Sequence, residues 1–215
     1  MLPLVPANTT IWGICGGSGS GKSTLVGMLR ALLPPDTVSV LHLDAYYRDL
    51  SHLQPSAREQ ANFDHPDSLE HELFVEHIDG LLAGRPAYVP TYDFATHSRL
   101  PEVDVVPPAP LVIVEGILIF AFAALRERFA YSVFLDVPES VRLERRVARD
   151  VVARGRTEAS VRAQFAATVA PMHDAFVQPW ASSASRIVRY GADYEQVARQ
   201  LADRFRSDKR ELRTP

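Results

Sequence analysis

The stretch GGSGSGKS, residues 16–23, decides the fold of this chain. It matches the pattern G-x-x-x-x-G-K-S/T, in which glycines without a Cβ let successive backbone N–H groups converge on a polyanion. In such a loop Lys22 reaches the β- and γ-phosphate oxygens of a nucleotide, and the Ser23 hydroxyl binds Mg²⁺. The predicted nucleotide-binding residues of this phosphate loop and its junction with the next helix are Gly16, Gly17, Ser18, Gly19, Ser20, Gly21, Lys22, Ser23 and Thr24.

The sequence on both sides of the phosphate loop supports this prediction. Residues 10–15 form a short apolar run typical of a buried strand. After the loop, apolar residues recur at helical spacing from Leu25 to Leu32, and Pro34 and Pro35 end the pattern. The alternative is a glycine-rich turn that matches the motif by chance, and such a turn would need neither the strand before it nor the helix after it.

Strands and helices alternate along the rest of the chain. Four more apolar, β-branched runs are typical of buried strands: residues 38–43, 111–114, 131–137 and 186–190. Helical patterns lie near residues 68–83, 141–152 and 161–169, and a capping-box-like sequence from Asp67 to Glu70 is expected to begin the first of them. The alternation predicts an α/β fold with a parallel sheet flanked by helices, in one domain over residues 1–215. Residues 86–107 interrupt it, and we expect them to form a β-hairpin insertion over the edge of the site.

Composition limits the classes of function. With 47% hydrophobic residues and a net charge of −3, the chain has the core of an ordinary globular protein and no general electrostatic footprint for nucleic acid. The single cysteine, Cys15, excludes an internal disulfide and a multi-cysteine zinc site. No apolar run approaches the length of a membrane span, and the N-terminus lacks the features of a signal peptide, so we expect no membrane partner and a cytoplasmic location.

Two carboxylates follow predicted strands. Asp44 comes after the second run, at the edge where open α/β sheets bind ligands, and could accept a proton from an attacking hydroxyl or join a Mg²⁺ shell. The alternative is an aspartate that caps the next helix. Glu115 ends the most apolar run, LVIVEG, where it is similar to the second metal-site acid of P-loop enzymes, with a simple strand terminator as the alternative.

Arginines are concentrated in residues 142–156. Those at positions 142, 145, 146 and 149 fall at helical spacing, near one face, and Arg154 and Arg156 extend the cluster. Arginine forks fit phosphate oxygens, so the cluster indicates an anion site. A solvated basic face, balanced by Glu144 and Asp150, is one alternative, and a nucleic-acid-binding helix is another that the negative net charge disfavours.

Two loop-like segments, NFDHPD (residues 62–67) and YDFATHSR (residues 92–99), mix aromatic, carboxylate and imidazole side chains. This mixture suits a small polar ring compound, held by stacking and directional hydrogen bonds. Of the seven histidines we assign only His97 to the site and treat the others as structural or surface residues. A neutral imidazole donates from one nitrogen and accepts at the other, so His97 could pair with either an acceptor or a donor on the edge of such a ring.

Taken together, GGSGSGKS, LDAYYRDL, NFDHPD, YDFATHSR, VEGILIF and RRVARDVVARGR, in this order, resemble the uridine kinase (uridine–cytidine kinase) family. The resemblance implies a nucleoside-monophosphate-kinase-like P-loop fold with a helical, arginine-rich lid at about residues 138–180. It implies phosphorylation of the 5′-hydroxyl of uridine and cytidine, as in pyrimidine salvage, with Mg²⁺ and with ATP, or alternatively GTP, as donor. Members of the family are commonly tetramers, so a homo-oligomer is expected.

The resemblance also implies roles for single residues. Asp44 is similar to the base that takes the 5′-hydroxyl proton, with Lys22, Arg149, Arg154 and Arg156 acting on the phosphates. Ser23 and Glu115, with Asp44, would hold Mg²⁺. The substrate-binding residues that the resemblance implies are Tyr47, Phe63, Asp64, Tyr92, Phe94, His97, Arg146 and Gln164.

One departure and three rival functions accompany this interpretation. Ser185 stands where the family usually has an aspartate before its last strand, a position expected to bear on the adenine side of the site. The nearest rivals are a phosphoribulokinase or a pantothenate kinase on the same scaffold, neither of which needs the YDFATHSR segment. A non-catalytic nucleotide switch is a rival from another class, but it would have no use for Asp44 and the arginine lid.

Overall fold

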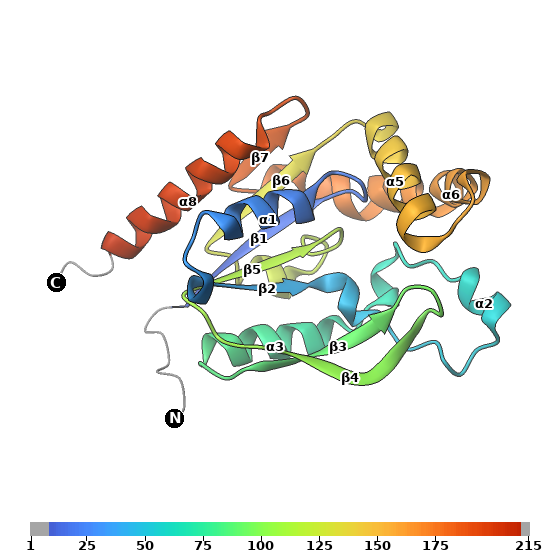
Figure 1. The fold of residues 1–215 in the computed structure, drawn as a ribbon, viewed down its shortest axis with the longest axis horizontal. Coiled ribbons are helices and arrows are strands. Elements are labelled where there is room, and N and C mark those ends of the chain that lie inside the picture. Colours follow the sequence, from blue (N-terminus) through green and yellow to red (C-terminus); the bar gives the residue numbers. More distant parts are fainter. Residues whose placement is uncertain (1–8, 212–215) are drawn as a thin grey trace.

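The computed structural model describes residues 9–211, and its centre is a parallel sheet whose strands lie in the order β2-β5-β1-β6-β7 (Figure 1). The bounds of these strands are β1 Thr10–Gly16, β2 Val38–His42, β5 Leu111–Gly116, β6 Tyr131–Asp136 and β7 Arg186–Arg189. All four neighbouring pairs are parallel. The carboxyl ends of the strands therefore meet at one edge, and the phosphate loop follows β1 there.

Helices cover both faces of the sheet, because successive side chains of a strand point to opposite sides. On one face, Trp12 and Ile14 of β1 pack in a cluster with α1 (Lys22–Ala31) and α8 (Tyr194–Glu211). On the other, Ile11 and Cys15 belong to a cluster with α3 (His71–Leu82) and α4 (Ala123–Arg126) (Figure 1). The predicted α/β fold with a parallel sheet flanked by helices is confirmed.

Two additions stand over the carboxyl edge of the sheet. The antiparallel strands β3 (Ala87–Asp93) and β4 (Ser98–Val106) form the hairpin. Across from it lie α5 (Glu139–Arg154) and α6 (Glu158–Gln164), as Figure 1 shows. The rest of the lid region consists of two π-helical turns, Phe165–Val169 and His173–Val177, with the short α-helix α7 (Ala170–Met172) between them and the 3-10 helix Gln178–Ser183 after them.

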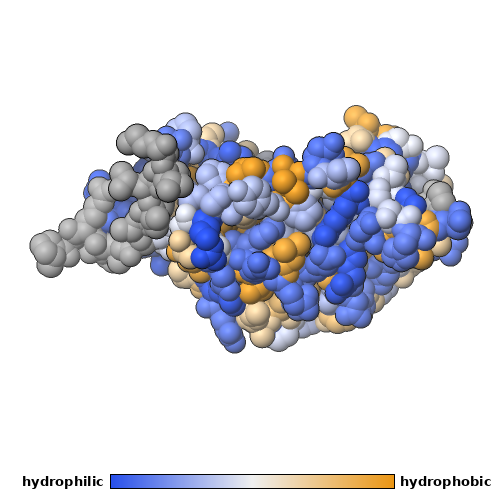
Figure 2. All heavy atoms as spheres, turned by 90° about the horizontal axis from the view of Figure 1, so that it is seen from below, coloured by the Kyte–Doolittle hydropathy of each residue, from blue (hydrophilic) through white to orange (hydrophobic). Residues whose placement is uncertain are grey.

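Figure 2 views the molecule from below Figure 1 and shows a face on which hydrophilic residues prevail, with apolar ones between them in small groups. Between residues 9 and 211, no helix combines the length and the apolar character that crossing a membrane requires.

The structure corrects three details of the sequence analysis. The helix expected near residues 68–83 begins at His71, because Pro66–Ser68 form a separate 3-10 turn, and the expected capping box is wrong, since no side chain caps the helix at Glu70. The second strand ends at His42, and Leu43–Tyr46 form a 3-10 turn. The long helix α8 was not predicted.

Adjacent leucines on α3 test how this helix packs against the sheet face that contains Ile11 and Cys15. Leu81 is fully buried, whereas Leu82 is 41% exposed. We expect Leu81→Ala to lower the free energy of unfolding by about 2–5 kcal/mol, because it leaves a cavity in the core. Leu82→Ala, on the same helix and with the same change in volume, should cost about 0.5 kcal/mol or less. Urea denaturation of both variants measures the difference, and equal losses would contradict the packing described.

Candidate active site

A cavity of about 520 Å³ lies at the carboxyl edge of the sheet, between the phosphate loop, the hairpin and the lid helices. It brings together residues that are up to 146 positions apart, from Ser18 to Gln164. The phosphate loop and α1 contribute Ser18, Gly19, Lys22 and Ser23. Gly17 lines a small neighbouring pocket, while Gly16, Ser20, Gly21 and Thr24 line neither. The predicted acceptor, metal and lid residues all line the main cavity, as described below.

The phosphate loop is glycine-rich because α5 approaches it closely. Gly19 has a φ of +81°, and a Cβ there would collide with the carbonyl oxygen of Arg142. A Cβ at Gly17 would lie 2.6 Å from Arg142 Nη1 and 2.9 Å from His173 Nδ1. Lys22 Nζ donates to the carbonyl oxygens of Gly16 and Gly17, at 3.0 and 3.3 Å. Burial lowers the pKa of Lys22, and the opposite charge of Glu115 works against this shift.

The Glu115 side chain, on β5, contacts one residue of α1 and one residue of β2. Its Oε1 accepts from Ser23 Oγ at 2.8 Å and lies 2.8 Å from His42 Nδ1, which donates because a carboxylate can only accept. His42 and Glu115 are register partners in β2 and β5. Burial alone would raise the pKa of Glu115, but His42, Lys22 and Ser23 together lower it. The hydrogen bond to Glu115 raises the pKa of His42.

His42, which the sequence analysis treats as a structural or surface residue, does not line the cavity but forms a hydrogen bond with the Glu115 carboxylate. Its role could not be found from spacing, because the two partners are 73 positions apart and meet only through the strand register. His173 is another histidine that the sequence analysis treats as a structural or surface residue. It is buried behind Gly17, and burial together with Arg142 lowers its pKa to about 4.

The oxygen donors around Ser23 fit a hard divalent cation. Ser23 Oγ and Glu115 Oε1 are 2.8 Å apart, and Asp44 is close enough for the Glu115 charge to raise its pKa, after the larger effect of burial. Asp44 is exposed to solvent within the cavity. Many protein atoms nevertheless surround its carboxyl group, and this is the burial that raises its pKa. In the described part of the chain no three acidic, histidine or cysteine side chains could hold a metal unaided. This suits Mg²⁺, which proteins commonly bind through one or two carboxylates plus phosphates and water.

Aromatic side chains line the acceptor side of the cavity. The Phe63 and His97 rings are stacked, with centroids 4.5 Å apart, and the Tyr47 ring lies 5.4 Å from that of Tyr92. His97 stands at the tip of the hairpin with a φ of +53°. Phe94, on the same tip, contacts the ring of Tyr92 and the guanidinium of Arg154.

Asp64 is the carboxylate that lines the cavity beside these aromatic residues. It is 6% exposed, and burial raises its pKa while the charge of Arg146 lowers it. Arg146 in turn donates from Nη1 to Ser18 Oγ and from Nη2 to Gln164 Oε1, both at 2.9 Å. A single guanidinium thus stands between the phosphate loop, the lid and the acceptor carboxylate.

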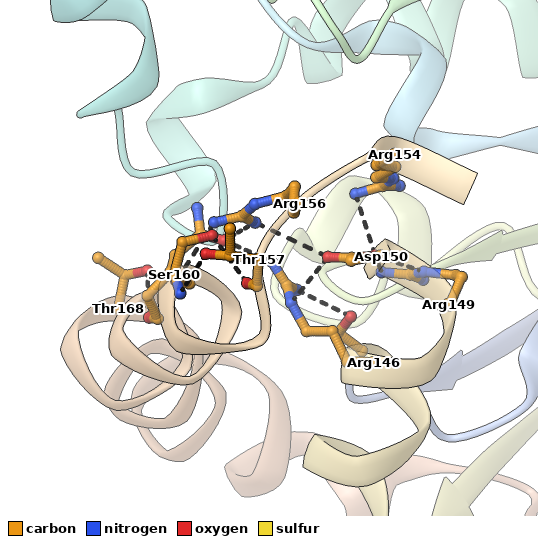
Figure 3. Close-up of polar contacts among 10 residues, drawn as sticks. Arg146, Arg149, Asp150, Arg154, Arg156, Thr157, Ser160 and Thr168 are labelled. Atoms are coloured by element: carbon orange, nitrogen blue, oxygen red, sulfur yellow. Dashed lines mark hydrogen bonds and ion pairs between the residues drawn. The ribbon is translucent and has the colours of Figure 1, made fainter. Parts of the chain in front are cut away.

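Four arginines, here called the lid arginines, face the cavity: Arg146, Arg149, Arg154 and Arg156 (Figure 3). Asp150 lies among them. Arg142 and Arg145, which the helical spacing placed in the same cluster, do not line the cavity. Arg142 is buried behind the phosphate loop, and Arg145 Nη1 donates to the carbonyl oxygen of Ser20 at 3.4 Å.

Comparison with known proteins places this architecture in a family. The model of the phosphoribulokinase/uridine kinase family matches residues 11–196. The chain belongs to this family. Within the family it is similar to the uridine kinase of Chloroflexus aurantiacus, with 45% identity over 79% of this chain and 81% of that protein. It is also similar to the uridine kinase of Aliivibrio fischeri, with 43% identity over 84% of this chain and 86% of that protein.

Solved structures support the kinase fold at lower identity. The D-glycerate 3-kinase of Cryptococcus neoformans superposes with a TM-score of 0.59 and 17% identity, over 85% of this chain and 86% of that chain. At this identity the similarity shows the fold alone. The identity to curated relatives, over most of each chain, shows that this phosphoribulokinase/uridine kinase family member is a transferase of the kinase type.

The two lysines of the chain offer a matched test of the phosphate loop. Lys22→Ala should abolish transfer to any acceptor, a loss of at least about 10³-fold, because the phosphates lose their nearest side-chain cation in the loop. Lys209→Ala, on α8 far along the chain, should retain activity. Steady-state turnover, with circular dichroism to verify folding, measures both. Turnover that persisted in folded Lys22→Ala would show that the loop does not bind the donor.

Proposed function

We propose that the protein phosphorylates the 5′-hydroxyl of uridine and cytidine with ATP. The observation that carries this proposal is that one cavity holds Lys22, Asp44 and the stacked Phe63–His97 pair. Lys22 suits the phosphates of the donor, and Asp44 suits a hydroxyl that must lose a proton. The stacked aromatic pair suits a planar base. The uridine kinase names of the curated relatives agree with this substrate class.

In the proposed reaction the 5′-oxygen attacks the γ-phosphorus, the bond from that phosphorus to the β–γ bridging oxygen breaks so that ADP leaves, and Asp44 accepts the hydroxyl proton. Lys22 binds the β- and γ-phosphate oxygens, and Arg149, Arg154 and Arg156 neutralise the charge that develops as the phosphoryl group moves. Mg²⁺, held by Ser23 and Glu115 with Asp44, would supply further charge neutralisation when bound.

Nucleoside recognition is assigned to the acceptor side. Asp64 would accept hydrogen bonds from the ribose hydroxyls, with Arg146 beside it and Gln164 completing the wall. Tyr92 and His97 would read the base edge. Three aromatic residues would enclose the nucleoside: Tyr47, Phe63 and Phe94.

The charge of the acceptor side argues against the rivals on this scaffold. Ribulose 5-phosphate and pantothenate are anions, whereas the acceptor side is lined by aromatic rings and the Asp64 carboxylate, with Arg146 as its neighbouring cation. A nucleoside is uncharged and does not need a second anion site. A turnover assay with uridine, cytidine, ribulose 5-phosphate and pantothenate separates the candidates. Turnover of either anion in preference to both nucleosides would overturn the proposal.

Three finer features stay predictions. ATP is the proposed donor, with GTP as the alternative, and competition between the two in the same assay tests this. A homo-oligomer, with a tetramer by analogy to the family, is tested by light scattering of the purified protein. A cytoplasmic location is tested by cell fractionation.

Asp44→Asn tests the proposed base. The variant should bind ATP normally but lower kcat by about 10²–10⁴-fold, because the amide cannot accept the hydroxyl proton. Steady-state kinetics with uridine, alongside ATP binding by calorimetry, separates the two effects. Near-normal kcat would remove Asp44 from the mechanism.

His97→Ala tests base reading. It should raise the KM for uridine and cytidine and leave the KM for ATP nearly unchanged. One lost hydrogen bond is worth about 1–3 kcal/mol, or about ten- to a hundredfold in kcat/KM. His97→Tyr should tilt the uridine-to-cytidine ratio, since a phenol cannot exchange donor and acceptor nitrogens. His52→Ala, an exposed histidine outside the cavity, is the control. Wild-type kcat/KM for both nucleosides in both His97 variants would refute the assignment.

A further inference from the structure

Asp150 is a carboxylate with no exposure to solvent, and it is surrounded by the four lid arginines (Figure 3). Its Oδ1 lies 2.8 Å from Arg149 Nη2 and 3.7 Å from Arg154 Nη1. Its Oδ2 lies 3.5 Å from Arg146 Nε and 3.7 Å from Arg156 Nη1. One anion is thus shared by all the guanidinium groups that face the cavity from the lid.

The backbone of Asp150 holds the same group of residues together. Its carbonyl oxygen accepts from the N–H of Gly155, which ends α5 in the left-handed region with a φ of +63°, and from the N–H of Arg156 at 3.2 Å. This turn brings the chain back over the helix. Arg154 and Arg156 therefore converge on the carboxylate although one precedes the turn and the other follows it.

Charge repulsion explains why such a carboxylate is needed. Burial lowers the pKa of both Arg146 and Arg154, and the neighbouring charge of Arg149 lowers the pKa of each further. Asp150 opposes this shift in both cases. Asp64 also opposes the shift at Arg146, with the larger effect, but Asp150 is the carboxylate that forms ion pairs with all four lid arginines and can hold these like-charged groups in one arrangement.

Asp150 cannot bind substrate itself. It does not line the cavity, and a carboxylate would repel phosphate oxygens. Two of its partners are further fixed from the cavity side, where Arg146 Nη2 and Arg156 Nη1 both donate to Gln164 Oε1, at 2.9 and 2.6 Å. Asp150, outside the cavity lining, and Gln164, within it, therefore fix the orientation of these two guanidinium groups.

We propose that Asp150 is a positioning residue that preorganises the lid arginines for phosphoryl transfer, an inference that rests on the proposed kinase function. Preorganised charge contributes most when it is already aimed where charge develops in the transition state. Loss of Asp150 should therefore impair the chemical step more than the binding of the nucleotide, which the phosphate loop also holds. A purely structural role would instead lower thermal stability and leave kcat per folded molecule unchanged.

Asp150→Asn is the main test, because it removes the charge and keeps the shape. We expect kcat to fall about ten- to a hundredfold, since small misplacement of catalytic groups has effects of this order. The Kd for ATP, measured by calorimetry, should stay the same or tighten, because one negative charge has left the lid. Wild-type kcat, or a loss of kcat explained by weaker ATP binding, would overturn the proposal.

Two further variants complete the design. Glu144→Gln removes a carboxylate from the same helix, but Glu144 pairs with Arg162 outside the cavity, so kcat should stay at the wild-type value. Asp150→Glu keeps the charge and shifts it by one methylene. It should lower kcat several-fold with unchanged ATP binding, and it decides the question if Asp150→Asn does not fold. Unchanged kcat in Asp150→Glu would then overturn the proposal.

The same assays keep the two proposals apart. Wild-type turnover of uridine and cytidine tests the proposed function alone. The ratio of variant to wild-type kcat, with whichever acceptor the wild type uses, tests Asp150. Failure of the wild type with nucleosides would reject the substrate assignment and leave the positioning role to be judged with another acceptor from the panel.

Discussion

The close approach of α5 to the phosphate loop is the constraint on which the site depends. A Cβ at Gly19 would collide with the backbone of Arg142 and a Cβ at Gly17 with its side chain, so the loop has no room for side chains of its own at these two positions. Arg142 Nε also donates to the carbonyl oxygen of Val137 at 3.1 Å, which ties the helix to the segment that leaves β6. Since Arg146, Arg149 and Arg154 follow on this helix and Arg156 comes directly after it, the position of these arginines relative to the phosphate loop is set where α5 begins.

The charges inside the cavity are divided by function. Five cations line it, on the phosphate loop and the lid, and three carboxylates face them: Asp44, Asp64 and Glu115. The whole chain carries a net charge of −3, so the positive potential is local to the donor side. Under the proposed function a triphosphate would be drawn to that side, and an uncharged acceptor would be held on the other by rings and hydrogen bonds. Asp44 would then lie between the two, as a proton acceptor requires.

Local sequence signals sufficed for the phosphate loop, the strands and the hairpin, because each is encoded within a short window. Roles that depend on a partner far along the chain could not be predicted in this way. His42 gains its place only from its register opposite Glu115, and Asp150 resembled a charge that merely softens a basic face until its arginines were seen to converge. The helix α8 is a different case, since its buried Val197, Leu201 and Phe205 recur at helical spacing and give a local signal that a helix is present.

Ser185 stands where the family usually has an aspartate, and its hydrogen bonds show what this serine does in the fold. Ser132 N donates to Ser185 Oγ and Ser185 N donates to Ser132 Oγ, both at 3.1 Å. Ser132 lies near the start of β6, level with Gly13 and three residues, or about 10 Å, from the level of Gly16. Ser185 therefore links the segment before β7 to the amino end of β6. The residue of this last segment that does reach the phosphate loop is Tyr194, whose hydroxyl donates to the carbonyl oxygen of Ser20 at 2.7 Å.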